Sequence, residues 1–279
     1  MILNLDRNFS PFPLEKEIDF DAFTFSGGEP HLRFKTDLSQ TSEVTIAHRV
    51  KEFNDMGLIL LAVNALRHIG VLKINLFLPY FPAARQDRLM VAGEALTVKV
   101  YADLLNSQYL SQITIFDPHS DVTPALLNKC KVIENYNFIK RIVDQLPDDL
   151  ILVSPDGGAL KKIYKVAAFL KNYEVVECSK SRDVKIGKLS GFKVYSEDLE
   201  GKDCLIVDDI CDGGGTFMGL SKELKAKNAG KLFLAVSHGI FSKGFDELEE
   251  YFEKIFTTDS FRTLENGKKL EQLSLNELI

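Results

Sequence analysis

The sequence predicts an α/β protein with parallel sheets, organised as two domains along the chain. Apolar runs of strand length alternate with amphipathic runs of helix length, and the whole series starts again near its middle. This alternation is typical of parallel sheets whose two faces are covered by helices. A chain of 279 residues is long enough for two modest domains.

The first half of the chain contains three apolar runs that we expect to be strands, with two helices between them. One helix, Met56–Ile69, carries its apolar residues at helical spacing. The expected strands are Glu43–His48 (EVTIAH), Lys73–Leu78 (KINLFL) and Gln112–Phe116 (QITIF), and the second helix is Thr97–Leu105.

The second half repeats this pattern after a break near Val132–Phe138. The break predicts a first domain over residues 1–135 and a second over 136–265, with the tail 266–279 completing the first. The expected strands are Leu150–Ser154, Glu174–Glu177, Cys204–Asp208, Lys231–Ser237 and Ile255–Thr258, and the expected helices are Leu160–Leu170 and Thr216–Lys227.

Composition excludes several classes of protein. The 34 basic against 40 acidic residues give a net charge of −6, which argues against non-specific nucleic-acid binding. No apolar run reaches the roughly 18–20 residues of a membrane span, and the N-terminus lacks the order of a signal peptide. The four cysteines lack metal-ligand spacing, which fits a reduced, cytoplasmic protein without disulfides.

The loop that follows the apolar strand CLIV combines two acids with three glycines. Ligands of parallel sheets bind at the carboxyl ends of the strands, so this loop is well placed for chemistry. Asp208 and Asp209 are suited to accept hydrogen bonds from sugar hydroxyls, and Thr216 is expected to cap a helix whose N-terminus faces an anion. The loop therefore predicts a sugar-phosphate site, and the alternative is a glycine-rich turn with solvated acids. The loop residues are Asp212, Gly213, Gly214, Gly215 and Thr216.

A second loop, Pro79–Arg88 (PYFPAARQDR), also follows a strand. Its two arginines and a glutamine suit an adenine nucleotide, because a guanidinium can clamp a phosphate or stack on a base. These residues are Arg85, Gln86 and Arg88, and the alternative is an exposed basic loop.

Single polar residues at three further strand ends are weaker candidates. His119, beside Asp117, is a candidate metal or phosphate contact, although a lone histidine is more often structural. Asp156 either caps the next helix or binds Mg²⁺. Lys180 and Arg182 open a polar stretch that is either a solvated loop or a lid carrying cations over the reacting groups.

Together these motifs resemble the ribose-phosphate pyrophosphokinase family, also called phosphoribosyl-pyrophosphate (PRPP) synthetases. The resemblance runs from about Phe25 to about Ser242 through six motifs in the family's order. These motifs are FSGGE, PYFPAARQDR, FDPHSD, SPDGG, KSR and VDDICDGGGTF.

The resemblance implies two phosphoribosyltransferase-like (Rossmann-like) domains, an active site between them, and a homo-oligomer built from dimers, with a hexamer as one such assembly. It implies Mg²⁺-dependent transfer of the β,γ-diphosphate of ATP to the anomeric hydroxyl of ribose 5-phosphate. It further implies roles for individual residues. ATP would contact Phe25, Glu29, Arg85, Gln86 and Arg88; the metal would use His119 and Asp156; Lys180, Arg182 and His119 would be catalytic; and Asp208, Asp209 and the Asp212–Thr216 loop would hold the sugar phosphate.

The chain departs from the family pattern at two glycines. Gly27 stands where the family has an aspartate, and Gly213 where it has a threonine. The smaller Gly213 gives room for a substituted 5-phosphate, so ADP-ribose is an alternative acceptor.

Two further functions compete with diphosphate transfer. One is that of a non-catalytic companion subunit, which the retained site residues argue against. The second is that of a PRPP-using phosphoribosyltransferase, which would leave the ARQDR segment without a purpose.

Overall fold

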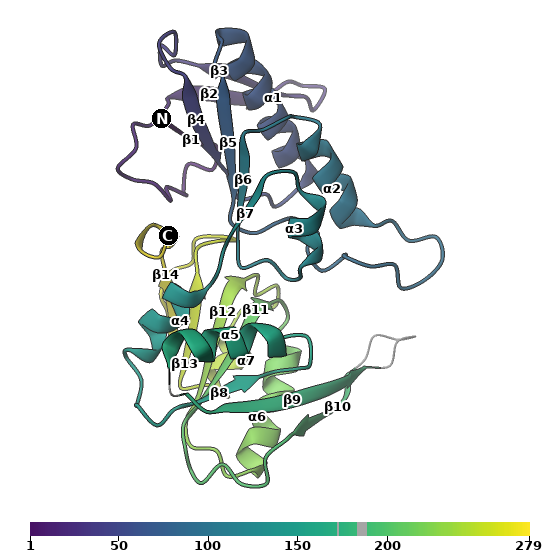
Figure 1. The fold of residues 1–279 in the computed structure, drawn as a ribbon, viewed down its shortest axis with the longest axis vertical. Coiled ribbons are helices and arrows are strands. Elements are labelled where there is room, and N and C mark those ends of the chain that lie inside the picture. Colours follow the sequence, from purple (N-terminus) through teal and green to yellow (C-terminus); the bar gives the residue numbers. More distant parts are fainter. Residues whose placement is uncertain (172, 183–188) are drawn as a thin grey trace. The chain divides into compact units, whose positions relative to one another are not determined.

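The structure is a computed structural model that describes residues 1–171, 173–182 and 189–279, and the side chains of these except residues 181, 182, 189 and 190 (Figure 1). It contains two compact units. The first comprises Met1–Glu134 with Leu275–Glu277 and Ile279, and the second comprises Asn135–Ser274 with Leu278. This division falls next to the boundary at residue 135 that the sequence predicts.

The first unit is built on a five-stranded sheet in the order β1-β4-β5-β6-β7, and all neighbouring strands are parallel. The strands of this sheet are β1 (Ile2–Asn4), β4 (Glu43–Ala47), β5 (Lys73–Leu78), β6 (Gln112–Phe116) and β7 (Cys130–Ile133), and the helices between them are α1 (Phe53–Ile69), α2 (Thr97–Asn106) and α3 (Val122–Leu126). The three predicted strands are confirmed as β4, β5 and β6, and the two helices as α1 and α2.

The two faces of this sheet differ in polarity. One face packs its alternate residues, such as Val44, Leu76 and Ile113, into a core with α1 and α2. At the middle of the other face, Thr45, Asn75 and Thr114 are polar and only half-buried. The expectation that apolar side chains cover both faces is therefore wrong for the middle of this face, although Ala47, Phe77 and Phe116 are buried further along it.

An antiparallel hairpin, β2 (Phe20–Thr24) and β3 (Pro30–Phe34), forms a separate two-stranded sheet in the first unit. Its strand β3 packs against α1. The hairpin carries the FSGGE segment at its turn, between Thr24 and Pro30. We did not predict this hairpin, because most of β2 is exposed and lacks an apolar run.

The second unit is built on a seven-stranded sheet in the order β10-β9-β8-β11-β12-β13-β14. Its strands are β8 (Ile151–Ser154), β9 (Val175–Arg182), β10 (Leu189–Val194), β11 (Cys204–Cys211), β12 (Leu232–Gly239), β13 (Lys254–Thr258) and β14 (Leu270–Leu273). Its helices are α4 (Tyr136–Val143), α5 (Leu160–Leu170), α6 (Gly215–Ala226) and α7 (Asp246–Glu249), and a 3₁₀ turn, η1 (Leu275–Glu277), follows β14.

Helices cover both faces of this second sheet, as predicted. Residues such as Val153 and Ile206 share a core with α6 and α7. The alternate residues point to the opposite face, where α4 and α5 pack against the strands. Figure 1 shows α4 and α5 lying together over the sheet.

Two features of the second sheet differ from expectation. The strand β10 runs antiparallel to β9, so the sheet is not wholly parallel. The residues of β14 pair with β13, which corrects the expectation that the whole tail 266–279 completes the first domain. Leu270 and Leu273 are buried against this sheet, and that burial explains the pairing. In the part of the chain that the structure describes, no helix is long and apolar enough to cross a membrane.

Candidate functional site

The first unit brings two predicted loops together at the carboxyl edge of its sheet. Because β5 and β6 are parallel neighbours, the loops that follow them start side by side. The backbone N–H of Phe116 donates to the carbonyl of Pro79 at 3.1 Å and joins the two loops. The nucleotide loop and the His119 segment therefore form one surface.

A buried carboxylate, Asp87, organises this surface. Its side chain is only 2% exposed, and Arg88 Nε donates to its Oδ1 at 3.0 Å. Burial opposes ionisation of Asp87, but the nearby Ser120 hydroxyl and the charges of Arg88 and His119 outweigh it and lower its pKa. Asp87 thus holds Arg88 and lies beside the loop of His119 and Ser120. We predicted no role for Asp87 from the sequence, although its position between two arginines of one loop was a usable signal.

The predicted nucleotide-binding side chains face outward from this anchor. Phe81 and Ala84 are buried and fix the loop to the core. Arg85, Gln86 and Arg88 are exposed, and the side chain of Arg88 is 70% exposed. The alternation places cations on the surface of a firmly held loop, where an anion can reach them.

The hairpin turn holds the other predicted nucleotide contacts, Phe25 and Glu29. The Phe25 N–H donates to the Glu29 carbonyl at 2.9 Å, and Gly28 takes the left-handed φ of 96° that this turn needs. Phe25 is 54% exposed, and its ring lies 5.7 Å from that of His31. A β-carbon on Gly27 would lie 2.6 Å from a carboxylate oxygen of Glu29. The glycine therefore permits Glu29 to fold back over the turn, which an aspartate would oppose by size and charge.

In the second unit, Asp156 pairs with Lys180 and lies close enough to Asp208 for their charges to interact. It follows β8, whose parallel neighbours are β9 and β11. Its Oδ1 accepts hydrogen bonds from the N–H groups of Gly158 at 2.8 Å and Ala159 at 3.2 Å, just before α5. Its Oδ2 forms the ion pair with Nζ of Lys180. Burial opposes the charge of Asp156, yet Lys180 and the two N–H groups lower its pKa.

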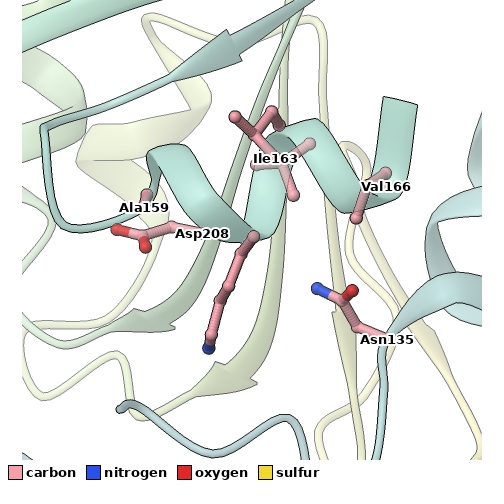
Figure 2. Close-up of a pocket in the computed structure, with 7 residues that line it drawn as sticks. Asn135, Ala159, Ile163, Val166 and Asp208 are labelled. Carbon is pink, nitrogen blue, oxygen red and sulfur yellow. The ribbon is translucent and has the colours of Figure 1, made fainter. Parts of the chain in front are cut away.

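Asp208 behaves in the opposite way. Burial, followed by the negative charges of Asp209 and Asp156, raises its pKa well above 3.8. The Asp209 N–H donates to its Oδ1 at 3.0 Å. Figure 2 shows the Asp208 carboxylate beside Ala159, at the start of α5, in a small hollow that Lys162 also lines. Three carboxylates thus crowd at this edge, where Lys180 pairs with one of them.

The glycine loop lies at the next position along the same edge. Strand β11 continues to Cys211, so Asp208 and Asp209 are strand residues and not loop residues. The N-cap of α6 is Gly214, with φ 75°, and no side chain caps the helix. The expectation that Thr216 caps this helix is therefore wrong, because Thr216 already lies inside its first turn. The uncapped N–H groups of this turn lack the partner that a capping hydroxyl would supply.

Gly213 is not required by the backbone. It is absent from the residues with positive φ, and a β-carbon there would make ordinary contacts of 3.6 Å with Cδ and Cε of Lys243. A larger side chain would fit at its first carbon.

The structure thus groups the predicted residues into one cluster in each unit. Arg85, Gln86, Arg88 and His119 share the edge of the first sheet, and Asp156, Lys180, Asp208 and the glycine loop share that of the second. The side chain of Arg182 lies outside the described residues. Among the described residues, no group of three or more His, Cys, Asp and Glu side chains forms a ready-made metal site.

Comparisons with known proteins show to which family the two halves of the chain are similar. The family model for the N-terminal domain of ribose phosphate pyrophosphokinase matches residues 16–108, and the phosphoribosyl transferase domain model matches residues 133–270. The ribose-phosphate pyrophosphokinase of Mycoplasma pneumoniae is 32% identical over 236 residues, which cover 83% of this chain and 70% of that protein. The enzyme of the same name from Corynebacterium glutamicum is 28% identical over 290 residues, covering 95% and 85%.

A solved structure has the same fold. The crystal structure of phosphoribosylpyrophosphate synthetase from Mycobacterium smegmatis superposes with a TM-score of 0.84 at 22% identity, covering 100% of this chain and 95% of that one.

Proposed function

Because the chain belongs to the ribose-phosphate pyrophosphokinase family, we propose that it transfers the β,γ-diphosphate of ATP to the anomeric hydroxyl of ribose 5-phosphate. The products would be PRPP and AMP. The observation that carries the proposal is the cluster of Asp156, Lys180 and Asp208 beside an uncapped glycine loop. Such a site offers acids for sugar hydroxyls, N–H groups for a phosphate and a cation for the group in transit.

We assign ATP to the exposed side chains of the first unit. Arg85 and Arg88 would bind phosphate oxygens, and Gln86 would bind the base or sugar. Asp87 would act as a positioning residue, since it holds Arg88 without facing solvent. Phe25 and Glu29 lie on an exposed hairpin turn, which supports the proposal that they reach the nucleotide of another subunit in a homo-oligomer.

We assign the acceptor to the second unit. Asp208 and Asp209 would accept hydrogen bonds from the ribose hydroxyls, and the N–H groups of the Asp212–Thr216 loop would bind the 5-phosphate. The anomeric oxygen would attack the β-phosphorus, and the bond from that phosphorus to the bridging oxygen of AMP would break. Such a step depends on positioning and charge neutralisation, which Lys180 and Arg182 would supply.

Mg²⁺ fits the acidic edge of the second unit. Burial and then the charges of Asp209 and Asp156 raise the pKa of Asp208, and a cation would relieve the repulsion among these carboxylates. Mg²⁺ binds through one or two carboxylates and completes its shell with water and substrate phosphates. Asp156 would hold it once Lys180 releases Oδ2, and His119 would serve the metal at the nucleotide. When bound, the ion would neutralise charge on the transferring diphosphate.

ADP-ribose is the second candidate acceptor, because Gly213 leaves the phosphate loop without a side chain. An acceptor with a substituted 5-phosphate would then give ADP-ribose 1-diphosphate. We expect the reaction to take place in the cytoplasm, since the four cysteines are free thiols and three of them are buried.

The test is AMP release from ATP and Mg²⁺ by the purified protein, with ribose 5-phosphate and ADP-ribose supplied separately and each product identified by mass. A mass that corresponds to PRPP supports the main proposal, and a preference for ADP-ribose supports the second. Absence of AMP with both acceptors would contradict both and favour a non-catalytic companion subunit.

A further inference from the structure

Lys243 lies beside the glycine loop, yet neither the loop motif nor the family resemblance assigns it a role. It follows β12, the parallel neighbour of β11, and so belongs to the same carboxyl edge as the loop. Its Cδ and Cε lie 3.6 Å from the point that a β-carbon of Gly213 would occupy. Its ammonium is one bond further along this side chain.

The turn that carries Lys243 is fixed to the loop by its backbone. The N–H groups of Phe241 and Ser242 donate to the carbonyls of Cys211 at 3.1 Å and Asp212 at 3.2 Å. The turn closes through the Gly244 N–H, which donates to the Phe241 carbonyl at 2.9 Å. Lys243 is thus held at the loop by the fold and does not depend on a flexible approach.

Phe241, at one end of this turn, is also held by its burial and by a side-chain hydrogen bond. The Phe241 side chain is 1% exposed, and its carbonyl accepts a second hydrogen bond, from Arg262 Nη2, at 3.1 Å. The lysine itself is exposed. Within the described part of the chain, its ammonium has neither a carboxylate nor a carbonyl partner.

The negative charge around the loop means that a cation there would help to bind a phosphate. Asp209 and Asp212 flank the N–H groups that would receive a phosphate, and Gly213 supplies no hydroxyl. An anion therefore approaches two carboxylates with fewer hydrogen-bond donors than a threonine at this position would give. An ammonium group beside Gly213 offsets both deficits.

Building on the proposed function, we propose that Lys243 is a substrate-binding residue that holds the phosphate on carbon 5 of the acceptor, in the space that Gly213 leaves open. The chemistry recognised is a phosphate oxygen bearing negative charge. It is common to ribose 5-phosphate and to the ribose-linked phosphate of ADP-ribose, and the two acceptors form separate arms of the test.

The experiment compares Lys243→Ala and Lys243→Arg with the wild type and with Lys231→Ala. Lys231 is a matched control, because it is an exposed lysine just before β12 and therefore at the opposite end of the same strand. Acceptor binding is measured by calorimetry without ATP, and kcat and both KM values by AMP release.

We expect Lys243→Ala to raise the Kd and KM of the acceptor by roughly ten- to hundredfold, the usual effect of losing a hydrogen bond to a charged group. We expect kcat and the KM of ATP to stay within about twofold of wild type, because the phosphate is bound equally before and during transfer. Lys243→Arg should restore most of the binding, and Lys231→Ala should match wild type.

The double variant Gly213→Thr/Lys243→Ala gives a second readout. If the lysine replaces a hydroxyl, the threonine should recover part of the lost affinity, so the two changes should not be additive. An acceptor Kd for Lys243→Ala within about twofold of wild type would overturn the inference.

The outcomes separate this inference from the proposed function. A wild type that binds an acceptor but releases no AMP would contradict the proposed function, while the calorimetric comparison would still decide the role of Lys243. A wild type that binds neither acceptor would overturn both.

Discussion

The two units present opposite charges from the same kind of sheet edge. In the first, a buried aspartate with a lowered pKa, Asp87, supports the exposed Arg88. In the second, Asp208, whose pKa is raised, crowds against Asp156, which pairs with Lys180. One edge is therefore relaxed without a ligand, and the other stores repulsion that a ligand or ion can relieve.

The difference shows that βα topology fixes where the functional residues lie, but not whether the site is positively or negatively charged. Both sets of residues follow parallel strands, as the fold requires. The charge at each edge depends on what surrounds the carboxyl group there. Nearby hydrogen-bond donors and cations favour the ionised form of an acid, whereas neighbouring acids disfavour it. Substitutions at the two edges should therefore change stability in opposite directions.

The largest expected effect is on turnover when the cation paired with Asp156 is removed. Lys180→Ala should lower kcat for AMP release by roughly 10²–10³-fold, the usual effect of losing one stabilising group in the transition state. The melting temperature should also fall, because the side chain is only 22% exposed and Asp156 loses its ion-pair partner. Unchanged kcat would contradict the role of Lys180 in transfer, and Lys222→Ala on the surface of α6 is the control.

Neutralising Asp208 should weaken activity but stabilise the fold. Asp208→Asn should raise the free energy of unfolding at neutral pH, because the native state raises the pKa of the wild-type carboxyl group and so disfavours its charged form. Since the folded pKa is raised, this advantage should shrink as the pH falls towards 3.8, where the wild-type carboxyl is protonated. Urea unfolding at several pH values, with Glu223→Gln as control, checks the sign. A variant less stable than wild type would contradict the idea that the charge of Asp208 destabilises the wild-type fold.

The equivalent change in the first unit should have the opposite sign. Asp87→Asn should lower the free energy of unfolding by about 1–2 kcal/mol and raise the KM of ATP several-fold, since Arg88 loses its anionic partner. Because the folded pKa is lowered, the stability difference should persist above 3.8 and disappear as the pH falls through the lowered value. Asp103→Asn removes only an exposed pair with Lys99 and is the control. Equal stability of Asp87→Asn and wild type would contradict the role of Asp87 in holding this loop.

The last expected effect concerns the choice of acceptor. Gly213→Thr should increase the kcat/KM ratio of ribose 5-phosphate over ADP-ribose by about tenfold, because one hydroxyl is added and space is lost. The fold should tolerate the change, since the first carbon meets only ordinary contacts. Competition between the two acceptors measures the ratio directly, and an unaltered ratio would show that position 213 does not select the acceptor.

Much of the fold could be predicted because its central strands are continuous apolar runs. KINLFL, QITIF and CLIV are confirmed as strands, and they place the two main loops correctly. The strand β14 was missed because only Leu270 and Leu273 are apolar in it. The strand β10 was missed because its pairing with β9 depends on a hairpin and not on an apolar pattern.

The site could be predicted by residue type but not by contact. Lys180 and Asp156 were assigned separate tasks, yet they form an ion pair, because β9 continues past Glu177, its last residue paired with β8, and carries Lys180 beyond that strand. Asp87 was passed over although it stands between two arginines, because the sequence does not show that its side chain is buried. The cap of α6 was misjudged because the turn uses the φ of Gly214 instead of a hydroxyl.

The strand β14 also affects whether a shortened form of this chain would stay soluble. It pairs with Ile255–Thr258 of β13, all of which are buried. A chain shortened before Leu270 would turn β13 into an apolar edge with unpaired backbone groups, which is a template for association with other chains. Residues 270–273 therefore protect solubility as much as they complete a sheet, and a shortened chain should aggregate before it loses any group of the site.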